Sequence, residues 1–357
     1  MIKKVFTPYT VLLFKLSVIL LLTTSCEGWL GRYDDKECDY NIQLRYDYNR
    51  ENESLINELP NYVHSMIEYL FDDVGVLYAV NPLLLDECTE QYISELTLPP
   101  GRYSVIAIGN QTTMSVVTAN GEAPIIGKTN RDAMLLTLQN RSTRTDNNND
   151  GYYNNCGRLY YGYRTFSVSE VDASRVRVDM VHSHCVIRFR IRWKRNTPPM
   201  GSYYTTMKYI PSEYGLMPQY VYPEKDNCQN HNSEYHDEYN RICQAVRHHI
   251  LTVHQDRNIL NHKLHLFRNV DGEVTGEFVM YRLRNETEPT MSLYMGTGDN
   301  GEQVMKAINL KRYFDDQGFD RDRTLKQEYS IEILIDGDQV FVMPISVADW
   351  TEGGVLG

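Results

Sequence analysis

The chain has 357 residues and a formal net charge of −11 at pH 7, from 47 acidic and 36 basic side chains. Binding to a polyanion needs a basic face, so this balance argues against a nucleic-acid partner. Apolar residues make up 42% and charged residues 23% of the chain, which is typical of a folded soluble protein.

The chain opens with the pattern of a bacterial export signal. Lys3 and Lys4 give a positive start to an apolar run over 11–22, and small residues then end at Ser25, directly before Cys26. This order predicts signal cleavage between Ser25 and Cys26, followed by lipidation of Cys26. The apolar run has about a dozen residues, whereas a bilayer-spanning helix needs about 20, which favours a cleaved signal over a permanent span. An ordinary signal peptide that is cut elsewhere, so that Cys26 is discarded, is the alternative.

We therefore predict a signal peptide over 1–25 and an acidic tether over 26–37. In chains that resemble lipoproteins of the Bacteroides type, acidic residues soon after the lipid-bearing cysteine accompany export to the outer surface. We expect the protein in the cell outer membrane, anchored by lipid and exposed at the surface.

The remaining cysteines are consistent with an oxidising compartment, because removing Cys26 from the total of seven leaves an even number. Six cysteines allow 15 connectivities, so the pattern does not define the pairing. Cys228 and Cys243 flank a polar, histidine-rich loop and form the disulfide that we favour. The six are Cys38, Cys88, Cys156, Cys185, Cys228 and Cys243.

Strand patterns begin in the first part of the mature chain. Apolar and polar residues alternate over 42–48, a period of two that buries one face of a sheet. The alternation over 63–71 is followed by a turn at 72–75 and predicts a β-hairpin, with a helix over 62–70 as the competing interpretation. Leu-Pro-Pro-Gly at 98–101 predicts a stop and a turn, after which a new strand begins at about Arg102.

The middle of the chain contains a polar loop and a change of strand phase. Residues 140–157 carry almost nothing apolar and predict an exposed loop. Strand character resumes at Leu159, and the alternation changes phase near Met180, which indicates a bulge or a turn. We place a domain boundary near Val171.

The second half resumes the same strand character. Residues 198–249 are rich in tyrosine and histidine, carry few strand signals, and are interpreted as a long insertion. Further strands are predicted at 264–267, 276–283, 290–294, 329–335 and 340–346, and the helix-compatible segment is 302–314. Many short strands and few helices predict an all-β fold of antiparallel sandwiches, with one sandwich domain over 38–171 and another over 172–357.

No motif predicts a catalytic site. The acidic loop that starts at Asp146 lacks the glutamate that would complete a calcium loop, and the glycine-rich segment 296–301 lacks the full phosphate-loop pattern. His182 and His184 share a strand face with arginines, whereas Cys185 points to the other face, so one face cannot easily present all three as zinc ligands. We interpret the histidines as part of a basic, exposed strand face. We expect no enzyme activity, no metal, no cofactor and no small-molecule substrate.

Seven short segments carry a resemblance to a known family. They are Cys38, Arg45-Tyr46-Asp47-Tyr48-Asn49, Tyr69-Leu70-Phe71-Asp72 before Gly75, Leu98-Pro99-Pro100-Gly101-Arg102-Tyr103, Leu159-Tyr160-Tyr161-Gly162, Tyr281-Arg282-Leu283 and Val347-Ala348-Asp349-Trp350. In this order, and after a lipoprotein signal, they resemble the FimB-type fimbrial anchor and accessory lipoproteins of Bacteroidales over most of the mature chain.

The resemblance implies two transthyretin-like β-sandwich domains in tandem and a role as fimbrial anchor or minor fimbrial subunit in cell adhesion. Its expected partners are fimbrial subunits, which bind by strand addition, and the outer membrane, which the chain reaches through its lipid. The alternative is a monomeric surface adhesin or glycan-binding lipoprotein whose tyrosine-rich loops contact the ligand.

Overall fold

The computed structural model describes most of the chain between Tyr40 and Ile345. The described residues are 40–49, 56–86, 91–111, 114–138, 152–153, 155–170, 172–194, 202–211, 213–221, 248–253, 261–266, 273–296, 302–324 and 326–345. The predicted signal peptide, Cys26, the tether, the acidic loop at Asp146 and the Cys228–Cys243 pair lie outside them. Within the described part, no helix is long and apolar enough to cross a membrane.

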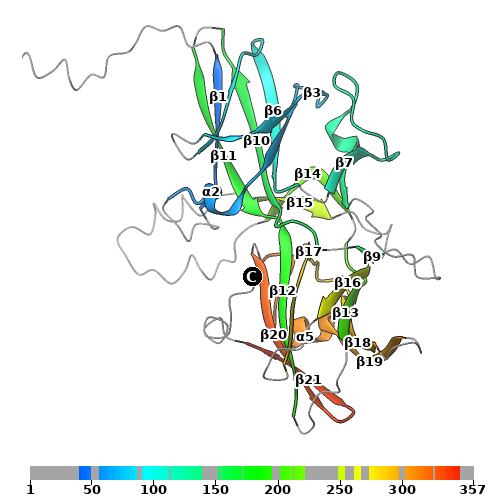
Figure 1. The fold of residues 1–357 in the computed structure, drawn as a ribbon. Coiled ribbons are helices and arrows are strands. Elements are labelled where there is room, and N and C mark those ends of the chain that lie inside the picture. Colours follow the sequence, from blue (N-terminus) through cyan, green and yellow to red (C-terminus); the bar gives the residue numbers. More distant parts are fainter. Residues whose placement is uncertain are drawn as a thin grey trace, which may run out of the picture.

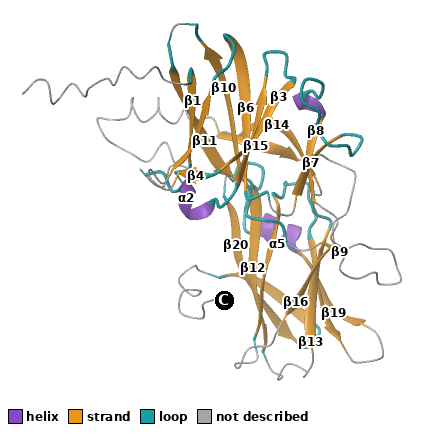
Figure 2. Ribbon diagram, turned by 45° about the horizontal axis from the view of Figure 1, so that its top comes forward, coloured by secondary structure: helices purple, strands orange, loops and turns teal. Residues whose placement is uncertain are grey.

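The fold is built almost entirely from strands, as the sequence predicts (Figure 2). The N-terminal half contains a rolled eight-stranded sheet with the strand order β3-β2-β6-β10-β11-β1-β5-β4. Its strands are β1 (Ile42–Asp47), β2 (Met66–Phe71), β3 (Leu77–Leu83), β4 (Leu85–Asp86), β5 (Gln91–Leu96), β6 (Gly101–Gly109), β10 (Tyr160–Val168) and β11 (Ser174–His182). The short helix α2 (Leu59–Tyr62) precedes β2.

A second sheet packs on one face of the rolled sheet. Its order is β15-β14-β8-β7. The strands are β7 (Met114–Thr118), β8 (Met134–Leu138), β14 (Glu213–Val221) and β15 (His248–Val253), and the short helix η1 (Arg131–Ala133) precedes β8. The N-terminal half therefore has two cores, one inside the roll and one between the two sheets.

The C-terminal half is a sandwich of two sheets (Figure 1). The first, in the order β17-β12-β20-β21, contains β12 (His184–Trp193), β17 (Val274–Tyr281), β20 (Gln327–Asp336) and β21 (Gln339–Pro344). The second, in the order β19-β18-β13-β16-β9, contains β9 (Tyr152–Tyr153), β13 (Ser202–Lys208), β16 (Asn261–Leu266), β18 (Thr290–Gly296) and β19 (Glu302–Asn309). Helix α5 (Leu310–Asp316) follows β19 directly.

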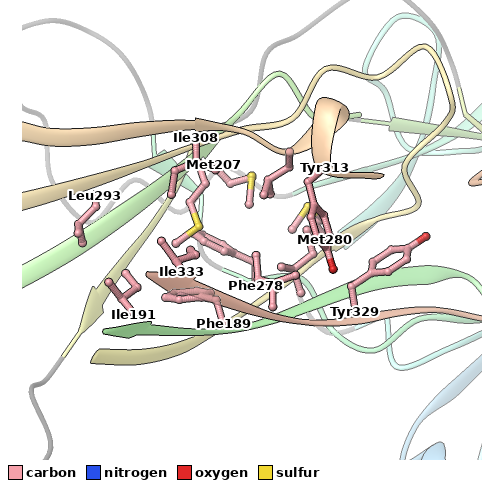
Figure 3. Close-up of a cluster of buried hydrophobic side chains, with 14 of the residues drawn as sticks. Phe189, Ile191, Met207, Phe278, Met280, Leu293, Ile308, Tyr313, Tyr329 and Ile333 are labelled. Carbon is pink, nitrogen blue, oxygen red and sulfur yellow. The ribbon is translucent and has the colours of Figure 1, made fainter. Parts of the chain in front are cut away.

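The core of this sandwich follows from alternation along its strands. Every second residue of β20 is buried, and Phe189 and Ile191 of β12 point into the same interior. In Figure 3, side chains of both sheets meet in this interior, where Phe189 and Phe278 have ring centroids 5.6 Å apart. Burial of such side chains contributes about 1.5–3 kcal/mol each, which makes this cluster the main stabilising contact between the two sheets.

Several predicted elements are confirmed. Strands β2 and β3 form the predicted hairpin, in which Gly75 adopts a φ of +84° that favours glycine. The phase change near Met180 corresponds to Ser183, where β11 of the first half ends and β12 of the second begins. The chain therefore passes from the rolled sheet to the C-terminal sandwich at Ser183, whereas the sequence analysis placed the domain boundary near Val171.

Two predictions were wrong. Residues 302–309 form β19 and not a helix, because pairing with β18 outweighs local helix propensity; only 310–316 are helical. The segment 198–249 is not simply an insertion outside the core, since β13 and β14 lie in it and bury Tyr203 and Tyr214. The alternation of apolar and polar residues in this segment is hard to recognise in the sequence, because a tyrosine side chain is apolar along its ring and polar at its hydroxyl.

A buried carboxyl group lies inside the rolled sheet. Glu68 of β2 is fully buried and accepts hydrogen bonds from the Tyr46 hydroxyl, from Asn81 Nδ2 at 2.8 Å and from Ser94 Oγ at 3.2 Å. Burial raises the pKa of Glu68 above its ordinary 4.5, and the three hydrogen bonds only partly oppose that shift.

We expect Glu68→Ala to lower the free energy of unfolding by about 3 kcal/mol, because three donors lose a buried acceptor. We expect a smaller loss for Glu68→Gln, which keeps one amide oxygen. The raised pKa of Glu68 means that its contribution to stability is fully present below pH 4.5 and is lost as the pH rises through the folded-state pKa. Urea unfolding at several pH values should therefore show a flatter pH dependence for Glu68→Gln, and an unchanged slope would contradict this account.

Candidate functional site

Strand β21 is an open edge of the C-terminal sandwich. Among the described residues it pairs only with β20, in an antiparallel register that aligns Ile331 with Pro344. The Ile345 N–H donates to the carbonyl of the opposite residue, Ser330, at 2.9 Å, so these two form a hydrogen-bonded pair and the next pair, Pro344 with Ile331, is non-hydrogen-bonded. By alternation, the main-chain N–H and C=O groups of Val340 and Val342 point away from β20, toward the open edge.

Strand β19 is an open edge of the opposite sheet. Its only described strand partner is β18, and the Leu310 N–H donates to the Pro289 carbonyl at 2.9 Å. The same alternation directs the main-chain groups of Ala307 and Asn309 away from β18. Both sheets of the sandwich thus end in an edge strand with outward-facing hydrogen-bonding groups on the same side of the molecule.

A groove of about 720 Å³ lies along these two edges. Its apolar lining comes from β19, α5 and β21, and includes Ile308, Tyr313, Val340 and Val342. The Lys306 ammonium lies 3.9 Å from Asp338 in the β20–β21 turn, and this pair connects the two edges beside the groove. An apolar groove flanked by open strand edges can accept an extended peptide by main-chain hydrogen bonding.

The outer face of β21 adds exposed apolar surface. Phe341 is 43% and Met343 38% exposed, and they alternate along the strand with the half-buried Val340 and Val342. Long, flat edges with apolar side chains are ready templates for another strand, and proteins usually protect them. Pro344, which has no N–H to donate, ends β21 and limits the edge to a short segment.

A smaller hollow of about 430 Å³ lies in the N-terminal half. The Tyr103 and Phe166 rings stack there with centroids 5.9 Å apart, and the Arg131 guanidinium lies 5.9 Å from the Tyr163 ring centroid. Asp72 is on the same lining. Aromatic rings next to charged and hydroxyl groups can bind a sugar face. The side chains of this hollow therefore suit the alternative function, glycan binding.

The two histidines at the junction of the halves are not exposed as predicted. His182 at the end of β11 is 1% exposed and His184 at the start of β12 is fully buried, because Ser183 between them lies inside the molecule where the chain crosses between sheets. The opposite direction of Cys185 is confirmed, since its side chain belongs to the C-terminal core.

The arginines of β12 are not a bare basic face either. Carboxylates of the neighbouring strands β17 and β20 pair with them, as in Arg188 with Glu277 at 2.9 Å and Arg190 with Glu332 at 2.9 Å.

Glu328 of β20 brings a third potential metal ligand to the histidines: one ligand atom from each of His182, His184 and Glu328 lies within 4.8 Å of the others. Sequence reasoning missed this residue, because Glu328 matches no motif and β20 lies far along the chain.

The two described cysteines, Cys156 and Cys185, are buried free thiols. Burial raises the pKa of each thiol well above its ordinary value, so neither is a reactive thiolate near neutral pH. The other predicted disulfide cysteines lie outside the described residues, and the favoured Cys228–Cys243 pair stays a prediction.

The sequence profile of one family matches residues 34–353. Its description is "Fimbrillin-A associated anchor proteins Mfa1 and Mfa2". The chain belongs to the Mfa2 fimbrial anchor family. Membership in the Mfa2 family associates the protein with fimbriae and with the cell envelope, and confirms the resemblance drawn from the sequence motifs.

Solved structures share the fold of this Mfa2-family chain at low sequence identity. The fimbrial anchor protein Mfa2 from Porphyromonas gingivalis is 13% identical, with a TM-score of 0.54 over 85% of this chain and 95% of that one. A candidate adhesin from Bacteroides thetaiotaomicron is 16% identical, with a TM-score of 0.56 over 88% and 100% of the two chains. A candidate polysaccharide-binding protein from the same species is 13% identical, with a TM-score of 0.58 over 86% and 98%. No curated protein sequence matches the chain.

Proposed function

We propose that this protein is an outer-membrane lipoprotein that anchors a fimbria, or serves as one of its minor subunits, and that its role is mechanical and not catalytic. Lipid on Cys26 would hold the chain to the membrane through a tether over 26–37, and two sandwich domains would follow. The observation that carries the proposal is the groove between β19 and β21 in a chain of the Mfa2 family.

The groove suits strand addition because both of its edges offer main-chain groups. A strand of a fimbrial subunit that lies along β21 would hydrogen-bond to the N–H and C=O groups of Val340 and Val342. Its apolar side chains would enter the groove and contact Ile308 and Tyr313. Main-chain bonds along the edge would supply affinity, and the shape of the groove would select the partner.

Deletion of the gene tests the anchor function directly. We expect the deletion strain to release fimbriae into the medium or to assemble fimbriae of abnormal length, and we expect the wild-type gene to restore attachment. Fimbriae in cell pellets and in culture supernatants can be compared by immunoblotting and electron microscopy. Fimbriae of normal length that remain attached in the deletion strain would contradict the proposal.

A glycan-binding adhesin is the second candidate, and the hollow at Tyr103 and Phe166 favours it. A glycan array probed with the purified soluble chain would detect this activity, and Tyr103→Ala should abolish any signal that comes from this hollow. Glycan binding together with normal fimbriae in the deletion strain would favour the adhesin over the anchor.

A further inference from the structure

We propose that His182, His184 and Glu328 form a binding site for a divalent transition-metal ion, with Zn²⁺ as the expected ligand, at the junction of the two halves. The three residues come from three strands: β11 of the rolled sheet, and β12 and β20 of the C-terminal sandwich. A metal ion bound there would connect the two halves where the chain crosses between them.

The geometry brings suitable ligand atoms together. The imidazole rings of His182 and His184 have centroids 3.6 Å apart, and His182 Nε2 lies 3.5 Å from Glu328 Oε1. One ligand atom from each of the three residues lies within 4.8 Å of the others. Ligand atoms on a tetrahedral zinc ion are separated by about 3.3 Å, given bonds of about 2.0–2.1 Å. The two imidazole planes are inclined by 31°, so the rings would rotate about their side-chain bonds to direct both nitrogens at one ion.

The hydrogen bonding of His184 prepares one nitrogen for a metal. Its Nδ1 lies 2.9 Å from the Leu159 carbonyl oxygen, which can only accept, so Nδ1 carries the proton and Nε2 presents a lone pair. That Nε2 atom is buried and has no hydrogen-bond partner among the described residues. Metal-binding histidines typically donate their other ring N–H to a carbonyl in this way, and an unpartnered buried nitrogen is costly without a ligand.

The charge states also suit a cation. Burial lowers the pKa of His182 to about 4 and holds that of His184 well below its ordinary 6.5, so both rings are neutral near pH 7. Burial opposes ionisation of Glu328, but the adjacent His182 and the nearby cations Lys326 and Arg188 lower its pKa to about 2. Two neutral imidazoles and one carboxylate are an established donor set for zinc, and a water molecule would complete four ligands.

Neighbouring cations compete with the metal for the carboxylate. Arg188 Nη1 lies 3.5 Å and Lys326 Nζ 4.0 Å from Glu328 Oε2, and the guanidinium of Arg282 donates to the His182 carbonyl at 3.3 Å. The contact between His182 and Glu328 uses the other oxygen, Oε1, which leaves Oε2 to the cations. The same carboxylate can therefore bind a metal through one oxygen and keep its ion pairs through the other.

Metal titration of the full chain, purified in detergent and stripped with chelator, tests the site. Co²⁺ should produce visible d–d absorption, and Zn²⁺ should displace it and raise the unfolding temperature. Glu328→Gln should weaken Zn²⁺ binding at the strongest site by at least about tenfold, and His184→Gln should do the same. Comparison with these variants separates the site from the other histidines of the chain.

Glu277→Gln is the matched control. It removes a carboxylate that pairs with Arg188 and Arg158 on the same sheet face but is not one of the three ligands. Its Zn²⁺ affinity should equal that of the wild type. If Glu328→Gln, confirmed as folded by circular dichroism, binds Zn²⁺ within twofold of the wild type, or if the wild type binds no metal, the proposal is overturned.

Discussion

The Ala307→Trp variant is expected to lose fimbrial attachment while it keeps its fold. Ala307 is exposed, lines the groove, and lies at a position of β19 whose main-chain groups face the open edge. An indole there would occupy the space that an added strand needs. We expect the affinity for the fimbrial subunit to fall by at least about tenfold, or 1.4 kcal/mol, and fimbriae to appear in the culture medium.

Ala133→Trp is the matched control for this variant. Ala133 is also exposed, and it lies in η1 of the N-terminal half, away from the groove. The same substitution there should leave both subunit binding and attachment unchanged. Binding of a purified fimbrial subunit can be measured by biolayer interferometry, and unfolding temperatures verify that both variants fold. Wild-type affinity in Ala307→Trp would exclude the groove as the acceptor.

The Cys26→Ser variant is expected to leave the membrane entirely. A serine cannot form the thioether that carries the lipid, and each buried CH₂ of an acyl chain contributes about 0.8 kcal/mol to membrane binding. We expect loss of acyl labelling with palmitate and a shift of the protein from the membrane fraction to the soluble fraction. Fimbriae would then be shed with their anchor, which distinguishes this defect from a blocked groove.

Cys38→Ser supplies the comparison for this experiment, because Cys38 is the next cysteine along the chain. It should keep both the label and the membrane location. If Cys26→Ser retains both properties, lipidation at this residue is refuted, and the alternative signal cleavage site becomes the better account of export.

Local patterns were sufficient for much of the strand assignment. The alternation at Ile187, Phe189 and Ile191 predicts one buried face of β12, and the structure places all three in the core. The turn before β3 and the Asp336-Gly337 turn before β21 were also readable, because glycine at positive φ marks such positions. These features depend on residues that are close together in the sequence, so a two-residue alternation or a turn-forming glycine is enough to predict them.

The helix-compatible segment shows where local reasoning fails. The amino-acid types over 302–309 suit a helix, yet this segment pairs with β18 and forms an edge of the groove. A strand partner that lies elsewhere in the chain offers main-chain bonds and burial that outweigh small differences in propensity. The groove could therefore not be predicted from the sequence, because one of its walls was expected to be a helix.

From the sequence alone came the all-β class, the family resemblance and the prediction of an export signal that ends before Cys26, since each depends on short segments taken in order. Only the tertiary structure decided that His182 and His184 are buried, that Glu328 joins them, and that two strand edges flank one groove. The reason is the parallel pairing of β12 with β20, which places Val186 beside Glu328 although a large part of the chain separates them. No local period encodes such a pairing, because it arises when both strands bury their apolar faces in the same core.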